Sequence, residues 1–421
     1  MTEENKQKNV SKQPILYVHY GDNWLRGSEI VLLDLLKAAK KSQYVSILWC
    51  NSEVLAKQAE KLGVKVIVDD FVCLGYWTTP KWNFLQFLQL LIKTGRLLKH
   101  YNVSLVHCNN GAPCQWLALI CKLKGIPLLL HLHARYMYRD RLTLLFHAAD
   151  SIVGVSKSVV NIFKKNEFPP QQVAVIPNGI EPQRALSKSP KDIRAELSAN
   201  EHDFVILYIG SLIPRKSVHQ LIYALHILKK SYQVKLAIVG NGSEASKLTQ
   251  LTSELDLKDD VQFFSASDEV ASYYSSNADC FISVPSEEVF GLTLAEASIA
   301  KLPIVTCNIS GINEIYSDKK NALLVSPDKT GELVVAIKSL IENPSLRKSI
   351  ATNAHHHILK NYSLARQFAA FNSAYQTLLQ RKSEAKGNQN TSRYSQLLIQ
   401  SIFNKLCKRI SALFVWRKTH E

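Results

Sequence analysis

The sequence lacks features that define several large classes of protein. No apolar run reaches about 18 residues, so no segment is predicted to cross a membrane as a helix. The first fourteen residues are polar and contain no apolar core, which argues against a secretory signal and predicts a disordered lead-in over residues 1–13. No GxGxxG follows the first predicted strand, which disfavours a nucleotide-linked dehydrogenase.

The spacing patterns of metal sites are missing as well. The eight cysteines form no CxxC pair and no Cys/His group with zinc-like spacing. Several of them, such as Cys50 and Cys280, stand in apolar runs, so we expect small buried side chains in a reducing compartment, which favours the cytoplasm. The run from His355 to His357 has no carboxylate at metal-like spacing and is interpreted as surface.

Positive charge is in excess, with 51 Lys and Arg against 35 Asp and Glu and a net charge of +16. A basic surface attracts nucleic acid, anionic lipid and phosphorylated ligands alike. No zinc-finger, RNP-type or homeodomain-like pattern is present, so nucleic acid is not predicted as a partner. A membrane surface and a diphosphate ligand both remain open.

Short apolar runs alternate with helical patterns such as Glu29–Lys41 and Leu85–His100, which is typical of βαβ units. The pattern breaks into Pro, Asn, Gly and Ser around Pro177–Pro190, which indicates a linker. The sequence therefore predicts an α/β protein with two Rossmann-like, doubly wound domains, residues 14–185 and 186–362, that face a central cleft. The expected strands are Ile15–His19, Val45–Trp49, Val64–Val68, Ser104–Cys108, Leu128–His131, Ser151–Val155, Val173–Ile176, Val205–Ile209, Lys235–Val239, Val261–Phe264, Cys280–Val284, Ile304–Thr306 and Ala322–Val325.

The chain continues after the second predicted domain. A helix over residues 363–380 is expected to pack back on the N-terminal domain. Residues 381–421 are interpreted as a polar spacer and a basic amphipathic helix, whose apolar stripe runs from Leu398 to Phe414. This last helix could dock on anionic lipid or pack against the N-terminal domain, and the sequence favours neither alternative.

The most informative segment is Pro285–Ala300, which follows a predicted strand, turns at Phe290-Gly291 and opens a helix. Glycine lets backbone N–H groups approach a phosphate, and a helix N-terminus favours negative charge. Glu288 lies in the turn and Glu296 in the helix, with seven residues between them. A glycosidase also needs two carboxylates, but both must face one glycosidic bond at about 5–10 Å. The spacing here instead fits separate positions on one elongated ligand.

This segment resembles the Glu-x7-Glu motif of the GT-B-fold retaining glycosyltransferases of family four, or glycosyl transferases group 1. The resemblance spans roughly residues 15–362 and is strongest in the second half. The other segments that carry it, in the family's order, are Arg26–Glu29, His131–His133, Val153–Ser156, Ile176–Gly179, Tyr208–Ser217, Val239–Ser243, Tyr274–Ser286 and Ser310–Glu314.

The resemblance implies roles for particular residues. Glu288 would contact the donor sugar and Glu296 the nucleotide ribose. Lys216 and Arg215 would supply positive charge to the leaving diphosphate, and His133, six residues after Pro127, would position the acceptor. The further donor-binding positions are the backbone amides of Phe290, Gly291 and Leu292, the glycine loop with Gly240 and Gly242, the helix start at Gly27 and Ser28, and Ser211, where the family usually has Arg.

The resemblance therefore implies a cytoplasmic retaining hexosyltransferase, possessing no cofactor beyond its nucleotide-diphosphate sugar. The acceptor would be a saccharide or a lipid-linked saccharide in cell-surface polysaccharide assembly, with peripheral contact to the inner face of the membrane. No DxD motif occurs, so no metal is expected. The alternative is a nucleotide-sugar-binding scaffold that has lost catalysis, which Ser211 makes plausible. Simpler interpretations also stand: Glu288 as a solvated turn residue, Gly240 and Gly242 as a tight turn, and His107, His131 and His133 as core residues.

Overall fold

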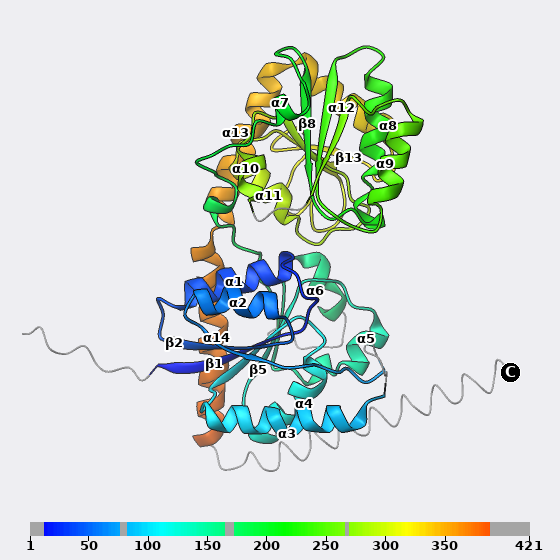
Figure 1. Cartoon of the computed structure of the whole chain (residues 1–421). Coiled ribbons are helices and arrows are strands. Elements are labelled where there is room, and N and C mark those ends of the chain that lie inside the picture. The colour runs from blue at the N-terminus through cyan, green and yellow to red at the C-terminus, as the bar shows by residue number, and fades with distance from the viewer. Residues whose placement is uncertain (1–11, 76–81, 165–171, 266–268, 388–421) are drawn as a thin grey trace, which may run out of the picture.

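The computed structural model describes residues 12–75, 82–164, 172–265 and 269–387. They form two α/β domains stacked end to end, each built on one parallel sheet (Figure 1). The predicted fold class is confirmed. All thirteen predicted strands are present, with ends within two residues of the expected ones.

The first domain contains a seven-stranded sheet in the order β3-β2-β1-β4-β5-β6-β7. Its strands are β1 (Gln13–His19), β2 (Tyr44–Cys50), β3 (Lys65–Val68), β4 (Leu105–Asn109), β5 (Leu128–Leu132), β6 (Ser151–Gly154) and β7 (Val173–Val175). Successive residues of β1 face opposite sides, so Leu16 and Val18 enter one core while Ile15 and Tyr17 enter the other. A strand buried on both faces needs a continuous apolar run, which is the pattern in the sequence.

The helices of the first domain begin and end at recognisable signals. They are α1 (Gly27–Ala39), α2 (Glu53–Lys61), α3 (Phe84–His100), α4 (Cys114–Lys124), α5 (Tyr138–Thr143) and α6 (Lys157–Lys164). The side chains of Ser52 and Asn83 accept hydrogen bonds from the first turns of α2 and α3. Gly125 ends α4 in the left-handed conformation, with φ of 60°.

The second domain repeats the plan around a six-stranded sheet in the order β10-β9-β8-β11-β12-β13. Its strands are β8 (Phe204–Ile209), β9 (Val234–Val239), β10 (Val261–Phe264), β11 (Cys280–Ser283), β12 (Ile304–Cys307) and β13 (Leu323–Val325). Its helices are α7 (Ile193–Glu196), α8 (His219–Leu228), α9 (Ala245–Glu254), α10 (Val270–Tyr274), α11 (Leu292–Ile299), α12 (Thr330–Glu342) and α13 (Pro344–Asn361). In both sheets the strand order reverses beside the first strand, where a ligand crevice forms in such folds.

The chain crosses between the domains twice, and the two crossings lie side by side. Ile180 in the first crossing pairs with Ser363 in the second, and the Ile180 amide donates to the Tyr362 carbonyl at 2.7 Å. A Cβ on Gly179 would lie 2.7 Å from Cα of Leu364, so this contact requires glycine. The predicted linker also contains a short 3-10 turn, η4 (Pro182–Arg184).

Helix α14 (Leu364–Gly387) leaves the second crossing and runs along the first domain (Figure 1). Its buried residues Phe371, Tyr375 and Leu378 complete the core on the α1 side of the sheet. The helix continues through Gly387, past the predicted start of the spacer at Arg381. The reason is that this stretch is rich in Lys, Glu and Ala, which favour helix.

Two predicted terminal segments lie outside the described residues: residues 1–11 of the lead-in, and the basic amphipathic helix within residues 388–421. Across the described ranges, no helix is both long and apolar enough to span a membrane. The seven cysteines in those ranges are all buried and free, as expected for small core side chains.

Candidate active site

The predicted cationic loop and the predicted glutamate turn lie together in the second domain. They follow β8 and β11, which are neighbours in the sheet. Lys216 Nζ donates to Glu288 Oε2 at 2.6 Å, and Arg215 Nη1 lies 3.8 Å from the same oxygen. The Ser286 amide donates to the Arg215 carbonyl at 2.9 Å, which ties the two loops along their backbones. The structure thus brings two cations and one carboxylate to the carboxyl edge of this sheet.

The Glu288 carboxylate is largely buried, with 14% of its side chain exposed. Burial disfavours its ionised form, but the charge and hydrogen bond of Lys216, followed by Arg215, outweigh burial and lower its pKa. Glu288 is therefore ionised at neutral pH. Because Lys216 is only 12% exposed, the pair forms a fixed element of the site and the solvated-turn interpretation of Glu288 is wrong.

Helix α11 begins immediately after this pair. Gly291 caps it with φ of 83°, a left-handed conformation that glycine adopts readily. Phe290 is buried and packs edge-on against Tyr362 with ring centroids 5.8 Å apart, so its ring is a core group and only its backbone remains available. Gly311, from the predicted downstream turn, packs on this segment, since a Cβ there would lie 2.6 Å from the Glu288 carbonyl oxygen.

The glycine loop after β9 packs directly on the loop after β8. A Cβ on Gly240 would lie 1.9 Å from the Gly210 carbonyl oxygen, and one on Gly242 would lie 2.2 Å from that of Leu212. Both glycines are therefore required for the close approach of two backbones. Ser211 lies within the packed loop, where its carbonyl accepts a hydrogen bond from the Tyr208 hydroxyl at 3.1 Å.

The first domain meets this site through the start of α1. A Cβ on Gly27 would lie 3.0 Å from Cδ1 of Leu292, so the N-termini of α1 and α11 adjoin across the cleft. The first turn of α1 is held by Glu29, whose Oε2 accepts from the Arg26 amide and from the Ser28 hydroxyl, each at 3.0 Å. Two helix starts from different domains thus adjoin at the cleft, and such starts favour an anion.

His133 follows β5 and is half-buried beside the same helix start. Its Nε2 lies 2.9 Å from Oδ1 of Asn109, and Nδ2 of Asn109 donates to the Ser28 carbonyl at 3.3 Å. Burial, together with the neighbouring His131 and His19, lowers the pKa of His133 well below its ordinary value. His133 is therefore neutral at physiological pH.

The deeper histidines are core residues, as the simpler interpretation predicts. His107 Nδ1 lies 2.7 Å from the Tyr375 hydroxyl, and its Nε2 lies 3.3 Å from His131 Nδ1. Burial lowers the pKa of His107 to about 3. His107 lies within β4 and His131 within β5, both fully buried, whereas His133 follows β5 and is half-buried.

Glu296 differs from the other predicted donor residues because its oxygens already have protein partners. Oε1 accepts from Arg184 Nε at 3.2 Å, and Oε2 accepts from the Tyr274 hydroxyl at 3.0 Å. Arg184 also bonds to Asp34 of α1, so one guanidinium joins carboxylates of both domains at the hinge. Burial raises the pKa of Glu296, and Arg184 offsets this only in part.

A second carboxylate joins the domains on the other flank of the cleft. Glu314, in the predicted Gly-x-x-Glu turn, accepts from the amides of Lys157 and Ser158 at 2.7 and 2.9 Å. These amides form the first turn of α6 in the first domain, so Glu314 caps a helix of the opposite domain. Both flanks of the cleft therefore contain charge-assisted contacts between domains.

Several of these residues were missed from the sequence: His19, Asn109, Arg184, Asp34 and Tyr274. His19 and Asn109 had a usable signal, since each is a polar residue at the carboxyl end of an apolar strand. Arg184 had none, because its partners Asp34 and Glu296 lie 150 and 112 residues away.

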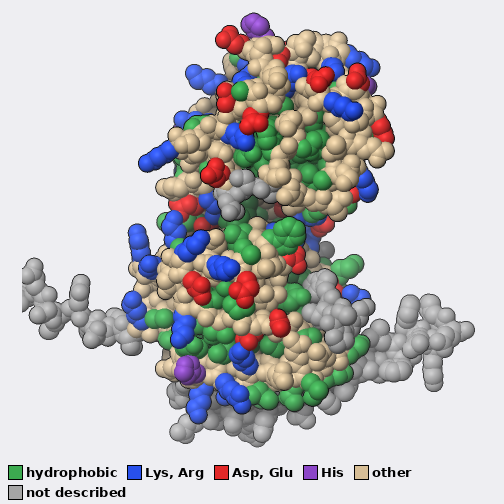
Figure 2. Space-filling view, viewed as in Figure 1, with side chains coloured by type: hydrophobic (Ala, Val, Ile, Leu, Met, Phe, Trp, Pro, Cys, Tyr) green, Lys and Arg blue, Asp and Glu red, His purple; other side chains and the backbone are tan. Residues whose placement is uncertain are grey.

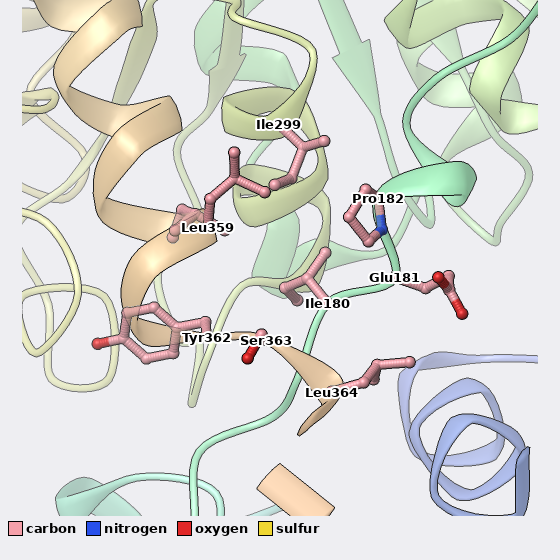
Figure 3. A pocket seen from close by; sticks show the side chains of 9 residues that line it. Ile180, Glu181, Pro182, Ile299, Leu359, Tyr362, Ser363 and Leu364 are labelled. Carbon is pink, nitrogen blue, oxygen red and sulfur yellow. The ribbon is translucent and has the colours of Figure 1, made fainter. Parts of the chain in front are cut away.

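The described residues contain no group of three or more His, Cys, Asp or Glu side chains placed to hold a metal ion. A small pocket exists at the hinge, where the two crossings lie side by side (Figure 3). It contains none of the predicted site residues, and its lining comes from the two crossings, α11 and α13: Ile180, Glu181, Pro182, Ile299, Ile358, Leu359, Tyr362, Ser363 and Leu364.

Comparisons with known proteins agree with this arrangement. An uncharacterized glycosyltransferase of Methanocaldococcus jannaschii is 28% identical over 222 residues, which cover 50% of this chain and 56% of that protein. The lipopolysaccharide glucosyltransferase WaaG of Escherichia coli is 26% identical over 208 residues, 48% of this chain and 55% of WaaG. The chain thus spans little more than half the length of these relatives.

Among solved structures, Anabaena HepE in complex with UDP and glucose matches with a TM-score of 0.75 at 21% identity, covering 87% of this chain and 100% of that one. This likeness supports the fold. The family model for glycosyl transferases group 1 matches residues 189–357, and the model for glycosyltransferase family 4 matches residues 25–184. Each model matches one of the two domains described above, and the chain belongs to the GT-B glycosyltransferases of family 4 and group 1.

Proposed function

We propose that this protein transfers a hexose-type sugar, with retention of configuration, from a nucleotide-diphosphate sugar to a saccharide or lipid-linked saccharide. The observation that carries the proposal is the Lys216–Glu288 pair beside the start of α11, which adjoins the start of α1. In the reaction the bond between the anomeric carbon and the diphosphate breaks, and a bond to an acceptor oxygen forms. The acceptor proton passes to the departing diphosphate, which takes up the bonding electron pair.

Negative charge develops on the diphosphate as its bond to the sugar breaks. Lys216, Arg215 and the amides of residues 290–292 stand where they would stabilise that charge, with the Gly27–Ser28 helix start opposite. Arg215 lies beside Lys216 and compensates for the uncharged Ser211. Charge stabilisation of this kind needs no metal, which supports a metal-independent reaction.

Glu288 is proposed to contact the donor sugar. It is ionised and fixed by Lys216, so its oxygens can accept hydrogen bonds from sugar hydroxyls. Glu296 is proposed to contact the ribose. A carboxylate has about four acceptor sites, and Arg184 and Tyr274 use two of them, so ribose binding does not require those bonds to break.

The test has two stages. A thermal-shift screen against UDP, GDP, ADP and their sugars identifies the donor, since a bound ligand stabilises the folded state. Release of nucleotide diphosphate is then measured on mixing that donor with acceptor extract, and the anomeric configuration of the product is compared with that of the donor. A nucleotide sugar that binds without being cleaved to nucleotide diphosphate would favour the catalytically inactive scaffold. A product with inverted anomeric configuration would refute retention.

We also propose that the protein contacts the membrane peripherally, on its cytoplasmic face. The predicted C-terminal helix lies outside the described residues, but α3 and α4 supply a surface that supports the contact (Figure 2). The helices lie side by side, with Gly95 against Ile120 and Lys124. Exposed apolar side chains gather on them: Phe84, Leu85, Leu88, Ile92, Leu119 and Leu123.

The charges on these two helices are of one sign. Neither helix contains Asp or Glu, while Arg96, Lys99, Lys122 and Lys124 lie on them. An apolar face with basic flanks fits an anionic bilayer. We expect co-sedimentation with anionic vesicles that Leu85→Glu with Leu88→Glu abolishes and Val335→Glu, an exposed apolar residue of α12, leaves unchanged. Equal binding by both variants would exclude the α3–α4 surface as the membrane contact. Deletion of residues 392–421 separates the contribution of the C-terminal segment.

A further inference from the structure

Four polar side chains of the first domain are hydrogen-bonded in series at the carboxyl edge of its sheet. They are Glu29 of α1, His19 of β1, Asn109 of β4 and His133 after β5. His19 and Asn109 stand opposite each other in the register of β1 and β4, and both are fully buried. Only His133, at one end of the series, reaches the cleft.

The orientation of the Asn109 amide is fixed by its surroundings. Its nitrogen, Nδ2, donates to the Ser28 carbonyl at 3.3 Å and lies 2.9 Å from His19 Nδ1. The reversed amide would place an oxygen against the Ser28 carbonyl oxygen, and two acceptors repel. Oδ1 therefore faces His133, at 2.9 Å from Nε2. Because a carbonyl oxygen only accepts, Nε2 of His133 must carry the hydrogen.

This hydrogen bond decides which nitrogen of His133 is free. Burial keeps the ring neutral, so with hydrogen on Nε2 the other nitrogen, Nδ1, has a lone pair. Among the described residues Nδ1 has no hydrogen-bond partner, and it is not sealed from solvent. Asn109 connects the His133 ring to the Ser28 carbonyl. Ser28 is next to Gly27, which contacts Leu292 of the other domain.

The other end of the series anchors Asn109. His19 Nε2 lies 2.8 Å from Glu29 Oε1, with 0% and 5% of the side chains exposed. His19 Nδ1 lies 2.9 Å from Nδ2 of the Asn109 side chain and also 2.9 Å from the backbone carbonyl oxygen of Asn109. It accepts from Nδ2 when the hydrogen of the His19 ring is on Nε2, where it is donated to Glu29. Gly21 covers the His19–Glu29 pair, since a Cβ on Gly21 would lie 2.5 Å from Glu29 Oε1 and 2.7 Å from His19 Nε2. With hydrogen on Nε2 of His19, its Nδ1 and the Ser28 carbonyl are both acceptors for Nδ2 of Asn109.

We infer that Asn109 is a positioning residue that fixes the Nε2–H tautomer of His133, so that Nδ1 accepts a hydrogen bond from a neutral hydroxyl of the acceptor. A phosphate or carboxylate at this position would face a lone pair and be repelled, so the group bound here is a sugar hydroxyl. The identity of the ligand rests on the proposed function, whereas the tautomer does not.

The tautomer is measured directly on the full-length protein. In NMR spectra of protein labelled with ¹⁵N-histidine, the two ring nitrogens of a neutral histidine have well-separated shifts. The His133→Gln variant assigns the His133 signals. We expect hydrogen on Nε2 in the wild type, and a mixture of tautomers in Asn109→Leu. Hydrogen on Nδ1 in the wild type, or an unchanged spectrum in Asn109→Leu, would overturn the inference.

Asn109→Asp provides the matched variant. It keeps an acceptor oxygen for His133 but loses the donor to the Ser28 carbonyl, so it separates the effect on the tautomer from the effect on the α1 start. Because the added carboxylate raises the pKa of His133, the spectrum is recorded at alkaline pH, where the ring is neutral. We expect the Nε2–H signal to persist in Asn109→Asp. Its disappearance there would mean that the α1 start, rather than the Asn109 oxygen, orients the ring.

Kinetics then test whether Asn109 acts through His133. Asn109→Leu is expected to lower kcat/KM for the acceptor about tenfold, the value of one hydrogen bond, and to cause no further loss in a His133→Ala background. An equal loss in both backgrounds would show a merely structural role and refute the inference. Absence of any transfer activity would refute the proposed function while leaving the NMR result to decide the tautomer.

Discussion

The two halves of the cleft hold charge in different ways. The second domain presents Lys216, Arg215 and the start of α11, and its Glu288 is ionised by the adjacent ammonium. The first domain presents His133, kept neutral by burial, on the buried partners Asn109 and His19. Under the proposed function, the cationic half suits the diphosphate of the donor and His133 suits an uncharged acceptor hydroxyl, so electrostatics would distinguish donor from acceptor.

The hinge belongs to both halves, since Arg184 holds Asp34 and Glu296 together. Both carboxylates are about nine-tenths buried, so Arg184→Ala leaves them facing each other without the guanidinium that binds both. We expect a loss of about 3–5 kcal/mol in the free energy of unfolding, measured by urea denaturation. Lys338→Ala, which breaks a half-exposed pair with Glu342, is expected to change it by less than about 0.5 kcal/mol. Similar values for both variants would show that the hinge network adds nothing.

The role of the cationic half is tested by removing the charge of Lys216. Under the proposed function the Lys216 ammonium stabilises the leaving diphosphate, so Lys216→Ala is expected to lower kcat by about 100-fold or more. Lys235→Ala is the control. Lys235 pairs with Asp260 at 3.0 Å and is about as buried as Lys216, but it lies near the amino end of β9, whereas the site lies at the carboxyl edge of the sheet. Near-wild-type turnover by Lys216→Ala, with donor saturating, would contradict the assignment.

The neutral half depends on the buried Glu29–His19 pair. Burial opposes ionisation of Glu29, but the bond to His19 and its charge lower the pKa to about 2. Since this lies below the ordinary value of 4.5, Glu29 stabilises the fold at neutral pH, and the stabilisation is lost as the pH falls from about 4.5 towards 2. Glu29→Gln should cost about 2 kcal/mol at pH 7 and less in acid, by urea denaturation. The exposed first-turn Glu53→Gln is the control, and a cost independent of pH would refute the pair.

The smallest expected effect concerns how the halves are held together. Glu314→Gln weakens the cap on α6 and should cost about 0.5–1 kcal/mol in stability, while increasing the radius of gyration in X-ray scattering because the cleft opens. Glu332→Gln is the matched control, because Glu332 accepts from the Ser326 amide within one domain. An equal change in the radius of gyration for both variants would show that Glu314 does not hold the two domains together.

The fold followed from the sequence because the central strands, such as β8, are buried along their whole length and need a continuous apolar run. The edge strands β3 and β7 are partly exposed, but their Val and Ile residues still gave a strand signal. The predicted end of α14 was wrong because a polar, charged segment can form a solvent-exposed helix as readily as a spacer.

The second-domain site was largely visible because Glu288, Gly291 and Glu296 stand in one short segment. In the first domain only His133 and the helix start at Gly27 and Ser28 were predicted. His19 and Asn109 were missed because they lie on separate strands, β1 and β4, and meet only where parallel strands end at one edge. The hinge was beyond reach for a similar reason, since Arg184 joins residues that no local pattern connects.

By itself the sequence determined the strands, the glycine-started helix and the lysine loop, because apolar periodicity, backbone freedom and charge are properties of neighbouring residues. Only the tertiary structure decided which carboxylates are ionised by a partner, which histidine reaches the cleft, and which nitrogen of that ring is free. Those properties depend on burial and on contacts between distant segments, and neither exists until the two sheets have formed and the chain has crossed back along α14.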